Sequence, residues 1–156
     1  MTFVRVGEDN QHCVSGEAGA IVGAMGLIQV YLIDDHAAVR QALLARLCAT
    51  PGLHVVGETG EAEAGLLEVK TLRPDVVIVE TKRADGRGLE IVSWIAQSGL
   101  GAKVVVLTSY PSEWERWAAH RAGAALYLLK DIASPDLVRQ IQSAVSPRPV
   151  SSLIHT

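Results

Sequence analysis

Short apolar runs that end in polar side chains are the feature that most constrains the fold of this 156-residue chain. Four such runs end at the acidic pair Asp34-Asp35, at Glu80, at Thr108 and at Lys130. The segments between the runs carry apolar residues at helical spacing. Strands that alternate with helices favour a parallel α/β sheet, in which ligands bind at the carboxyl ends of the strands. The sequence therefore predicts that these polar side chains share one crevice.

Five strand–helix units are predicted, with right-handed crossovers. The strands are expected at residues 28–33, 54–57, 74–79, 103–107 and 125–129. The helices are expected at residues 37–49, 61–72, 89–97, 112–122 and 134–145. Val39, Leu43 and Leu47 share one face of the first helix and are expected to be buried. Gly123 suits the end of the fourth helix, because glycine readily adopts positive φ at that position.

The composition of the chain indicates a single domain and excludes several classes of partner and site. Hydrophobic residues make up 49% of the chain, which is enough for one domain with a core. The net charge is −3 and the basic residues are scattered, which argues against nucleic acid or an anionic membrane as the direct partner. No His or Cys cluster has zinc-site spacing, and no apolar run is long enough to span a bilayer. We therefore expect a cytoplasmic protein.

The two ends of the chain differ from its middle. Residues 1–26 are rich in glycine and lack a sustained period, so we expect a poorly ordered extension, with translation beginning at Met1 or Met25. Residues 27–146 are expected to form the domain. Residues 147–156 contain two prolines and are typical of a tail or the start of a linker.

The polar strand ends suggest a specific chemistry. Asp34, Asp35 and Glu80 supply the carboxylate oxygens that Mg²⁺ prefers. Thr108 can donate a hydrogen bond, and Lys130 can present a positive charge, to an anionic phosphoryl group. Acidic residues are also common in turns, so a simple loop-capping role for the aspartate pair stays open.

Three segments carry a resemblance to a known family: VYLIDDH at 30–36, VVVLTSY at 104–110 and GAALYLLKD at 123–131. They closely resemble the receiver domain of two-component response regulators, and most of all its NarL/LuxR-type branch. The resemblance covers residues 28–146. It implies a flavodoxin-like, CheY-like (βα)5 fold, a doubly wound five-stranded parallel sheet with strand order 2-1-3-4-5.

The resemblance also implies roles for single residues. Asp34 and Asp35 match the metal-binding acids of the family, and the backbone carbonyl of Lys82 matches a further metal contact. Thr108 matches the switch hydroxyl, and Lys130 matches the lysine that binds the phosphoryl group. Mg²⁺ is therefore the expected ion, unless Lys82 or the arginine after it neutralises the acids.

Glu80 departs from the family pattern, because it stands where receivers have the phosphoacceptor aspartate. It would also belong to the metal pocket. The extra C–C bond displaces the attacking oxygen by about 1 Å, and such a misplacement can cost ~100-fold in rate, so ordinary phosphorylation is not expected. Two interpretations stay open. The longer carboxylate reaches Thr108 and Lys130 and partly mimics a phosphoryl group, or it pairs with a lysine in a frozen scaffold.

Aromatic residues add a switch and a surface to this prediction. Tyr127 matches the aromatic side chain that turns inward when receivers are activated, and we expect it to couple to Thr108. A half-buried strand aromatic is the simpler interpretation of this residue. Trp114 and Trp117 lie one helical turn apart, so one of them is expected in the core. An exposed tryptophan would instead suit a partner or dimer contact.

The expected function is that of an atypical (pseudo-)receiver, a non-enzymatic module for signal transduction and transcriptional regulation that works independently of phosphorylation. Its expected partners are a second copy of the chain or another protein, and a histidine kinase. We expect no nucleic-acid binding by this chain alone. Two alternatives stay open: an Mg²⁺-dependent phosphotransfer or phosphatase enzyme, and a small-ligand sensor that uses the acidic pocket. The glutamate at position 80 argues against the enzyme, because it alters the nucleophile.

Overall fold

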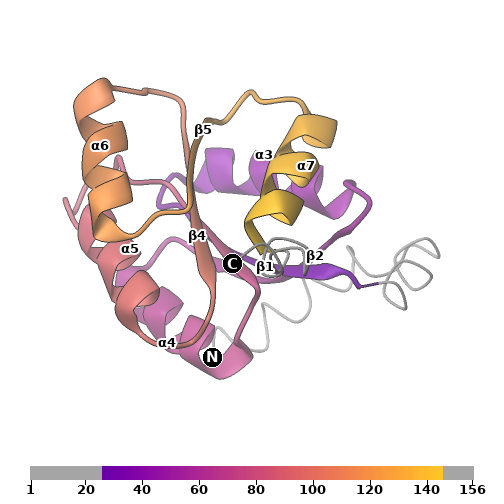
Figure 1. Cartoon of the computed structure of the whole chain (residues 1–156), viewed down its shortest axis with the longest axis horizontal. Coiled ribbons are helices and arrows are strands. Elements are labelled where there is room, and N and C mark those ends of the chain that lie inside the picture. Colours follow the sequence, from indigo (N-terminus) through magenta and orange to yellow (C-terminus); the bar gives the residue numbers. More distant parts are fainter. Residues whose placement is uncertain (1–25, 146–156) are drawn as a thin grey trace, which may run out of the picture.

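The computed structural model describes residues 26–145, in which five strands alternate with five helices (Figure 1). The strands are β1 (Ile28–Ile33), β2 (Leu53–Thr59), β3 (Val76–Val79), β4 (Lys103–Thr108) and β5 (Leu126–Leu129). The helices are α3 (Ala37–Cys48), α4 (Ala62–Leu72), α5 (Gly88–Gln97), α6 (Glu113–Ala122) and α7 (Ser134–Val145). Apart from Gly26, the predicted extension and both candidate start codons lie outside the described residues, as does the predicted tail.

The five strands form one parallel sheet in the order β2-β1-β3-β4-β5, which confirms the predicted topology. The chain runs outward from β1 to β2 and then returns to place β3 on the other side of β1. The strand order therefore reverses between β1 and β3. In open α/β sheets, the crevice for ligands forms at such a switch point, beyond the carboxyl ends of the two strands.

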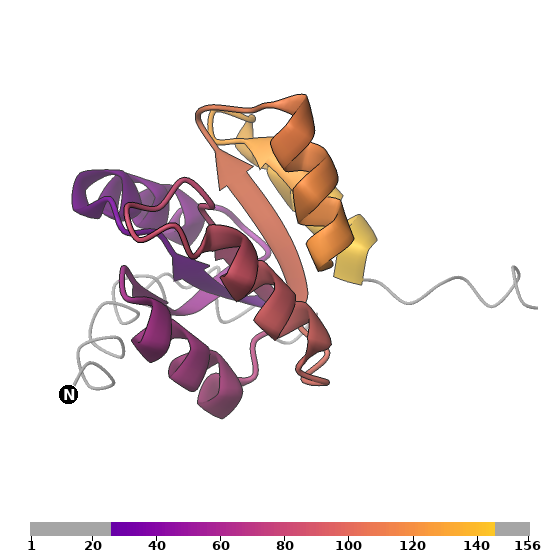
Figure 2. The same ribbon diagram turned by 90° about the vertical axis from the view of Figure 1, so that its left-hand side faces the viewer.

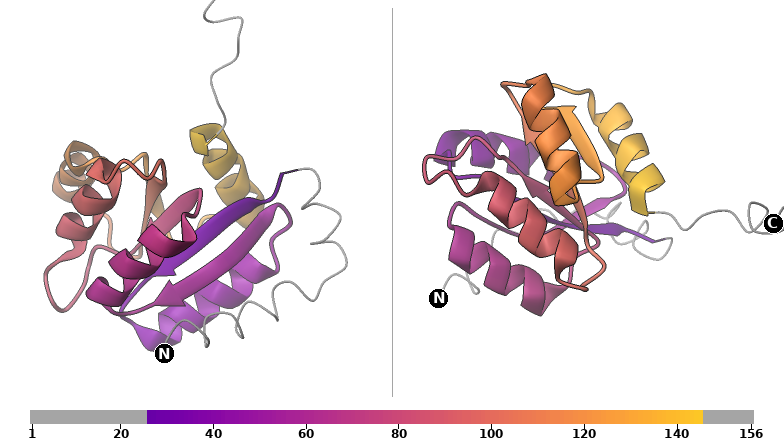
Figure 3. Two further views of the ribbon diagram at one scale, coloured as in Figure 1. Left: turned by 90° about the horizontal axis from the view of Figure 1, so that it is seen from below. Right: turned by 60° about the vertical axis from the view of Figure 1, so that its left-hand side comes forward.

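Helices cover both faces of the sheet. Helices α3 and α7 pack on one face, and α4, α5 and α6 lie side by side on the other (Figures 2 and 3). Alternate residues of β3 point to opposite faces, so Val77 joins one core cluster and Ile78 joins the other. Burial on both faces explains why the central strands are apolar at every position.

The observed β2 is longer than the predicted strand, which ended at residue 57. It continues through Glu58 and Thr59, which pair with Leu32 and Ile33 of β1. The sequence pattern did not predict this part of the strand, because Glu58 and Thr59 are both polar. Their pairing with β1 is a tertiary contact that the local pattern does not contain.

Two helix details test the predicted apolar faces. Leu43 and Leu47 are buried as expected, but the prediction for Val39 is wrong, since its side chain is exposed. Val39 lies in the first turn of α3, beyond the edge of the core. Gly123 ends α6 with φ of 115°, as predicted, and a Cβ there would collide with Ala96. None of the helices in residues 26–145 combines the length and apolar character needed to cross a bilayer.

Candidate functional site

The carboxyl ends of β1, β3 and β5 bring two acids and a lysine together. Asp34 follows β1 and Glu80 follows β3, and both side chains are buried. The amide of Glu80 donates to the carbonyl of Ile33 at 3.0 Å, so the sheet pairing continues into the site. The ammonium of Lys130 lies 2.7 Å from Oδ2 of Asp34 and 2.9 Å from Oε1 of Glu80. The structure thus places these three predicted residues in one crevice.

Lys130 is held in its charged form by its two partners. Burial alone would lower its pKa, but the hydrogen bonds and charges of Asp34 and Glu80 outweigh burial and keep the pKa above its ordinary value. One ammonium facing two buried carboxylates leaves a formal excess of one negative charge. Such a group of charges is stable only while every member keeps its partner.

Backbone contacts hold the lysine in place. Arg46 of α3 donates through Nη1 to the carbonyl oxygen of Lys130 at 2.5 Å, and through Nη2 to the carbonyl oxygen of Ile132. Its Nε also donates to Oγ of Ser134 at 3.1 Å. Arg46 was not among the predicted site residues, because nothing local distinguishes this arginine from its exposed neighbours in the helix.

Both oxygens of Glu80 are engaged. Oε1 meets Lys130, and Oε2 accepts a hydrogen bond from the backbone N–H of Lys82 at 2.8 Å. Thr108 is also buried, but its hydroxyl accepts from the N–H of Tyr110 at 3.1 Å. Within residues 26–145, no hydrogen bond joins Glu80 to Thr108. The predicted reach of Glu80 is therefore seen toward Lys130 only, because the second oxygen is taken by the nearby turn.

The aspartate pair retains acceptor capacity beside this ion-pair cluster. Oδ2 of Asp35 accepts from the N–H of Ala84 at 2.9 Å, whereas Oδ1 is buried without a hydrogen bond. Oδ1 lies 3.2 Å from Nδ1 of His36, which in turn is 3.6 Å from Oδ1 of Asp34. One ligand atom from each of these three residues fits within 4.8 Å. A buried carboxylate oxygen without a hydrogen bond in such a set fits a divalent cation. His36 was not among the predicted ligands.

The alternative in which Lys82 or Arg83 neutralises the aspartates is not seen, because both cations have other partners. Arg83 donates to the carbonyl of Gly60 and pairs with Asp85, both at 2.9 Å. The ammonium of Lys82 lies 3.7 Å from Glu115. The cation that reaches the acids is instead Lys130, since it is carried there by the end of β5.

Tyr127 points inward and is hydrogen-bonded, so the half-buried interpretation is wrong. Its side chain is only 4% exposed, and its hydroxyl donates to Oε1 of Glu115 at 2.6 Å. The same hydroxyl accepts from the N–H of Ser112 at 3.3 Å. Burial and the bond to Glu115 raise the pKa of Tyr127 to about 12. The guanidinium of Arg116 lies 4.9 Å from the ring centroid.

Glu115 is the polar residue of this region that sequence reasoning missed. The spacing Ser112-x-x-Glu115 matches a capping box, in which the glutamate reaches back to the N–H of the capping serine. Ser112 does cap α6, since its Oγ accepts from the N–H of Glu115 at 3.0 Å. The N–H of Ser112 is satisfied by Tyr127 instead, which leaves the Glu115 carboxylate inside the protein. The capping signal was visible, but the inward direction was not.

Trp114 and Trp117 are both exposed, so the prediction that one of them packs in the core is wrong. They are 68% and 58% exposed. Helix α6 buries Glu115 and Ala119, which are four residues apart, and this turns the tryptophans outward. We refer to Trp114 and Trp117 as the α6 surface.

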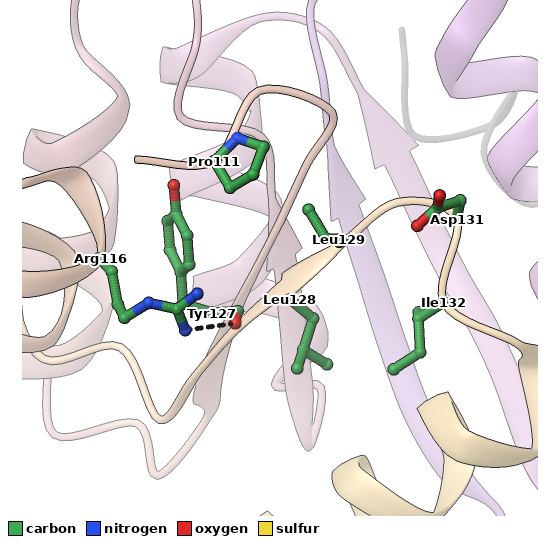
Figure 4. Close-up of a pocket in the computed structure, with 7 residues that line it drawn as sticks. All are labelled: Pro111, Arg116, Tyr127, Leu128, Leu129, Asp131 and Ile132. Carbon is green, nitrogen blue, oxygen red and sulfur yellow. Dashed lines mark hydrogen bonds between the residues drawn. The ribbon is translucent and has the colours of Figure 1, made fainter. Parts of the chain in front are cut away.

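A groove of about 370 Å³ lies beside this helix, over β5 and the chain that follows it (Figure 4). Arg116 projects from α6 toward β5, where it donates to the carbonyl oxygen of Tyr127 at 3.4 Å. The other lining residues are Pro111, Leu128, Leu129, Asp131 and Ile132. Tyr127 also lines the groove, which thus connects α6 with β5.

A comparison with protein families matches residues 30–142 to the response regulator receiver domain. This chain belongs to that family. As a receiver, it takes part in signal transduction, and both the predicted family and its NarL/LuxR-type branch are confirmed by the relatives.

Two curated relatives illustrate the branch. The DNA-binding transcriptional activator DevR/DosR of Mycobacterium tuberculosis is 34% identical over 122 residues, which are 78% of this chain and 56% of the relative. The nitrate/nitrite response regulator protein NarL of Escherichia coli is 29% identical over 123 residues, 79% of this chain and 57% of the relative. The chain therefore spans a little over half the length of these relatives.

A solved structure agrees with the fold. A LuxR-family two-component response regulator from an Aurantimonas species superposes with a TM-score of 0.70 at 25% identity. The superposition covers 77% of this receiver and 86% of that chain.

Proposed function

We propose that this receiver gives its output without phosphorylation of residue 80. The observation that carries the proposal is the engagement of both Glu80 oxygens, one by Lys130 and one by the N–H of Lys82. Phosphoryl transfer requires a nucleophile aligned with the phosphorus atom. A buried carboxylate that is longer by one methylene and doubly held is not available for that attack. The same point argues against a phosphotransfer or phosphatase enzyme.

The contacts of Glu80 support partial mimicry of the phosphorylated state. The lysine that resembles the phosphoryl-binding lysine of receivers binds Glu80 directly, and Tyr127 lies in the inward position. A carboxylate carries one charge, whereas a phosphoryl group carries nearly two, and Thr108 remains outside the arrangement. We therefore propose a switch biased toward its active state.

The proposed output is a protein contact in transcriptional regulation. The α6 surface exposes two tryptophans, a residue type that is enriched where proteins meet. A second copy of this chain is the proposed partner, and a histidine kinase would dock without transferring phosphate. The proposed location is the cytoplasm.

A divalent cation, Mg²⁺ by family resemblance, is proposed to be held by Asp34 and Asp35. Asp35 retains a buried oxygen without a hydrogen bond there, and the backbone carbonyl of Lys82 stays a predicted third ligand. When bound, the ion would offset the negative charge that Lys130 leaves uncompensated. His36 would lie beside the ion.

A comparison of wild type with Glu80→Asp tests the proposal. We expect wild type to show no mass increase with acetyl phosphate, while Glu80→Asp gains one phosphoryl group. Unmodified wild type should lie between unmodified Glu80→Asp and beryllofluoride-loaded Glu80→Asp in oligomeric state and in NMR spectrum, because the mimicry is partial. Identical behaviour of the two unmodified proteins would end the mimicry idea and leave a frozen scaffold.

A further inference from the structure

We propose that Glu115 is the positioning residue that couples Glu80 to the α6 surface, in place of the Thr108 hydroxyl. The inference rests on the proposed function, since it names the route by which the biased switch reaches its output. Its basis is one buried carboxylate on α6 that contacts two other parts of the fold.

Glu115 holds the loop after β3 and the strand β5 at the same time. Its Oε2 accepts from Oγ1 of Thr81 at 2.8 Å, and its Oε1 accepts from the hydroxyl of Tyr127 at 2.6 Å. Lys82 adds a positive charge 3.7 Å from Oε1. A buried carboxylate is stable only when such donors surround it, and bonds to an ionised group are stronger than neutral ones. Loss of the charge would therefore loosen both contacts.

Glu80 binds the same loop one residue further along, at Lys82. Thr81 lies between Glu80 and Lys82, and the N–H of Lys82 donates to Glu80 at 2.8 Å. Gly88 packs directly against the backbone of Thr81, where any Cβ would collide. Thr81 and Lys82 thus link the two carboxylates: Lys82 is bonded to Glu80, and Thr81 is bonded to Glu115. We expect a change at Glu80 to reach Glu115 through these two residues.

Thr108 does not provide this connection. Its hydroxyl accepts from Tyr110, and within residues 26–145 it has no hydrogen bond to either Glu80 or Tyr127. The Tyr127 hydroxyl instead accepts a hydrogen bond from the N–H of Ser112 and donates one to Glu115. Both partners lie at the start of α6. The position of the tyrosine is therefore decided by the first turn of this helix.

The exposed tryptophans lie in or next to the first turn of α6, so their indole signals are sensitive to its position. Trp114 is adjacent to Glu115 in the chain, and Trp117 follows two residues later. Displacing the Glu115 carboxylate would shift the first turn of α6 and change the presentation of both indoles. Trp94 of α5 has no part in the network and serves as an internal reference.

The test measures how far a perturbation at Glu80 travels. Glu80→Gln removes the charge that Lys130 binds while keeping the size of the side chain. Its effect is read from the ¹H–¹⁵N indole cross-peaks of Trp114 and Trp117. We expect Glu80→Gln to shift both peaks in the wild-type background, and the shift to be lost in Glu115→Gln. Thr81→Val, which removes only the donor hydroxyl, should give the same loss.

Glu113→Gln is the matched control. It removes the same charge from the same helical turn, but Glu113 is exposed, and its pairing is with Arg116 at 4.0 Å rather than with Thr81 or the Tyr127 hydroxyl. The Glu80→Gln shift should persist in this background. Thermal unfolding of each variant checks that it is folded. If Glu115→Gln is unfolded, the loss of the indole shift is measured in Thr81→Val instead.

Two results would overturn the inference. A Glu80→Gln shift that survives in Glu115→Gln and in Thr81→Val would remove Glu115 from the route and leave the proposed function standing. No shift of Trp114 or Trp117 in any background would show that the Glu80 site and the α6 surface are independent. That outcome would remove the biased switch as well, in favour of a frozen scaffold.

Discussion

The crevice around Lys130 and the α6 surface differ in how well their groups are satisfied. In the crevice, Lys130 pairs with both Asp34 and Glu80. On α6, two large aromatic side chains remain in contact with solvent. A site for chemistry needs free groups, whereas a site for recognition needs exposed ones. The contrast supports the proposals that this receiver acts through its surface and that the crevice sets the state of that surface.

Removing the cation from the crevice should have the largest effect. Lys130→Met leaves two buried carboxylates facing each other, which we expect to cost about 3–5 kcal/mol of unfolding free energy. Urea unfolding followed by circular dichroism measures the loss. Lys103→Met, at an exposed lysine, is the control and should stay near wild type. A cost below about 1 kcal/mol would mean that the ion pairs do not stabilise the crevice.

The hydrogen bonds from Arg46 to the backbone around Lys130 can be removed without changing the lysine itself. Arg46→Met leaves the carbonyl oxygens of Lys130 and Ile132 without their donor, and we expect a cost of about 2–3 kcal/mol. Amide hydrogen exchange should accelerate selectively in residues 130–134. Arg139→Met, on the exposed side of α7, should leave exchange in this segment unchanged. Uniform acceleration across the domain would argue against a local support.

Alkaline pH should weaken the link between the two regions. Tyr127 keeps its proton to about pH 12 in the folded state, whereas the unfolded chain releases it near pH 10, so stability is full below pH 10 and falls between these values. Two pKa units correspond to about 3 kcal/mol. Lys130 acts in the same direction, because stability from its raised pKa is lost as pH rises through the folded value.

Tyr127→Phe separates the share of the tyrosine from that of the lysine. The variant should show a shallower loss of unfolding free energy between pH 10 and 12. The exposed Tyr110 offers the control, since Tyr110→Phe should follow the wild-type profile. Parallel profiles for Tyr127→Phe and wild type would mean that the buried hydroxyl does not govern this transition.

Truncation of the α6 surface should affect stability least. Trp114→Ala and Trp117→Ala remove exposed side chains, so each should change the unfolding free energy by only about 0.5 kcal/mol. Self-association, measured by analytical ultracentrifugation, should nevertheless be reduced. Unchanged association in the double variant would place the partner contact elsewhere.

The sequence by itself determined the sheet and the meeting of Asp34, Glu80 and Lys130. Continuous apolar runs specify buried parallel strands, and the carboxyl ends of parallel strands share one edge, so local pattern and topology are enough. Only the tertiary structure decided that Glu115 points inward and that Trp114 and Trp117 point outward. The direction in which α6 faces depends on the buried donors that its side chains can reach. Thr81 comes from the loop after β3 and Tyr127 from β5, and no local pattern connects either residue to that face of the helix.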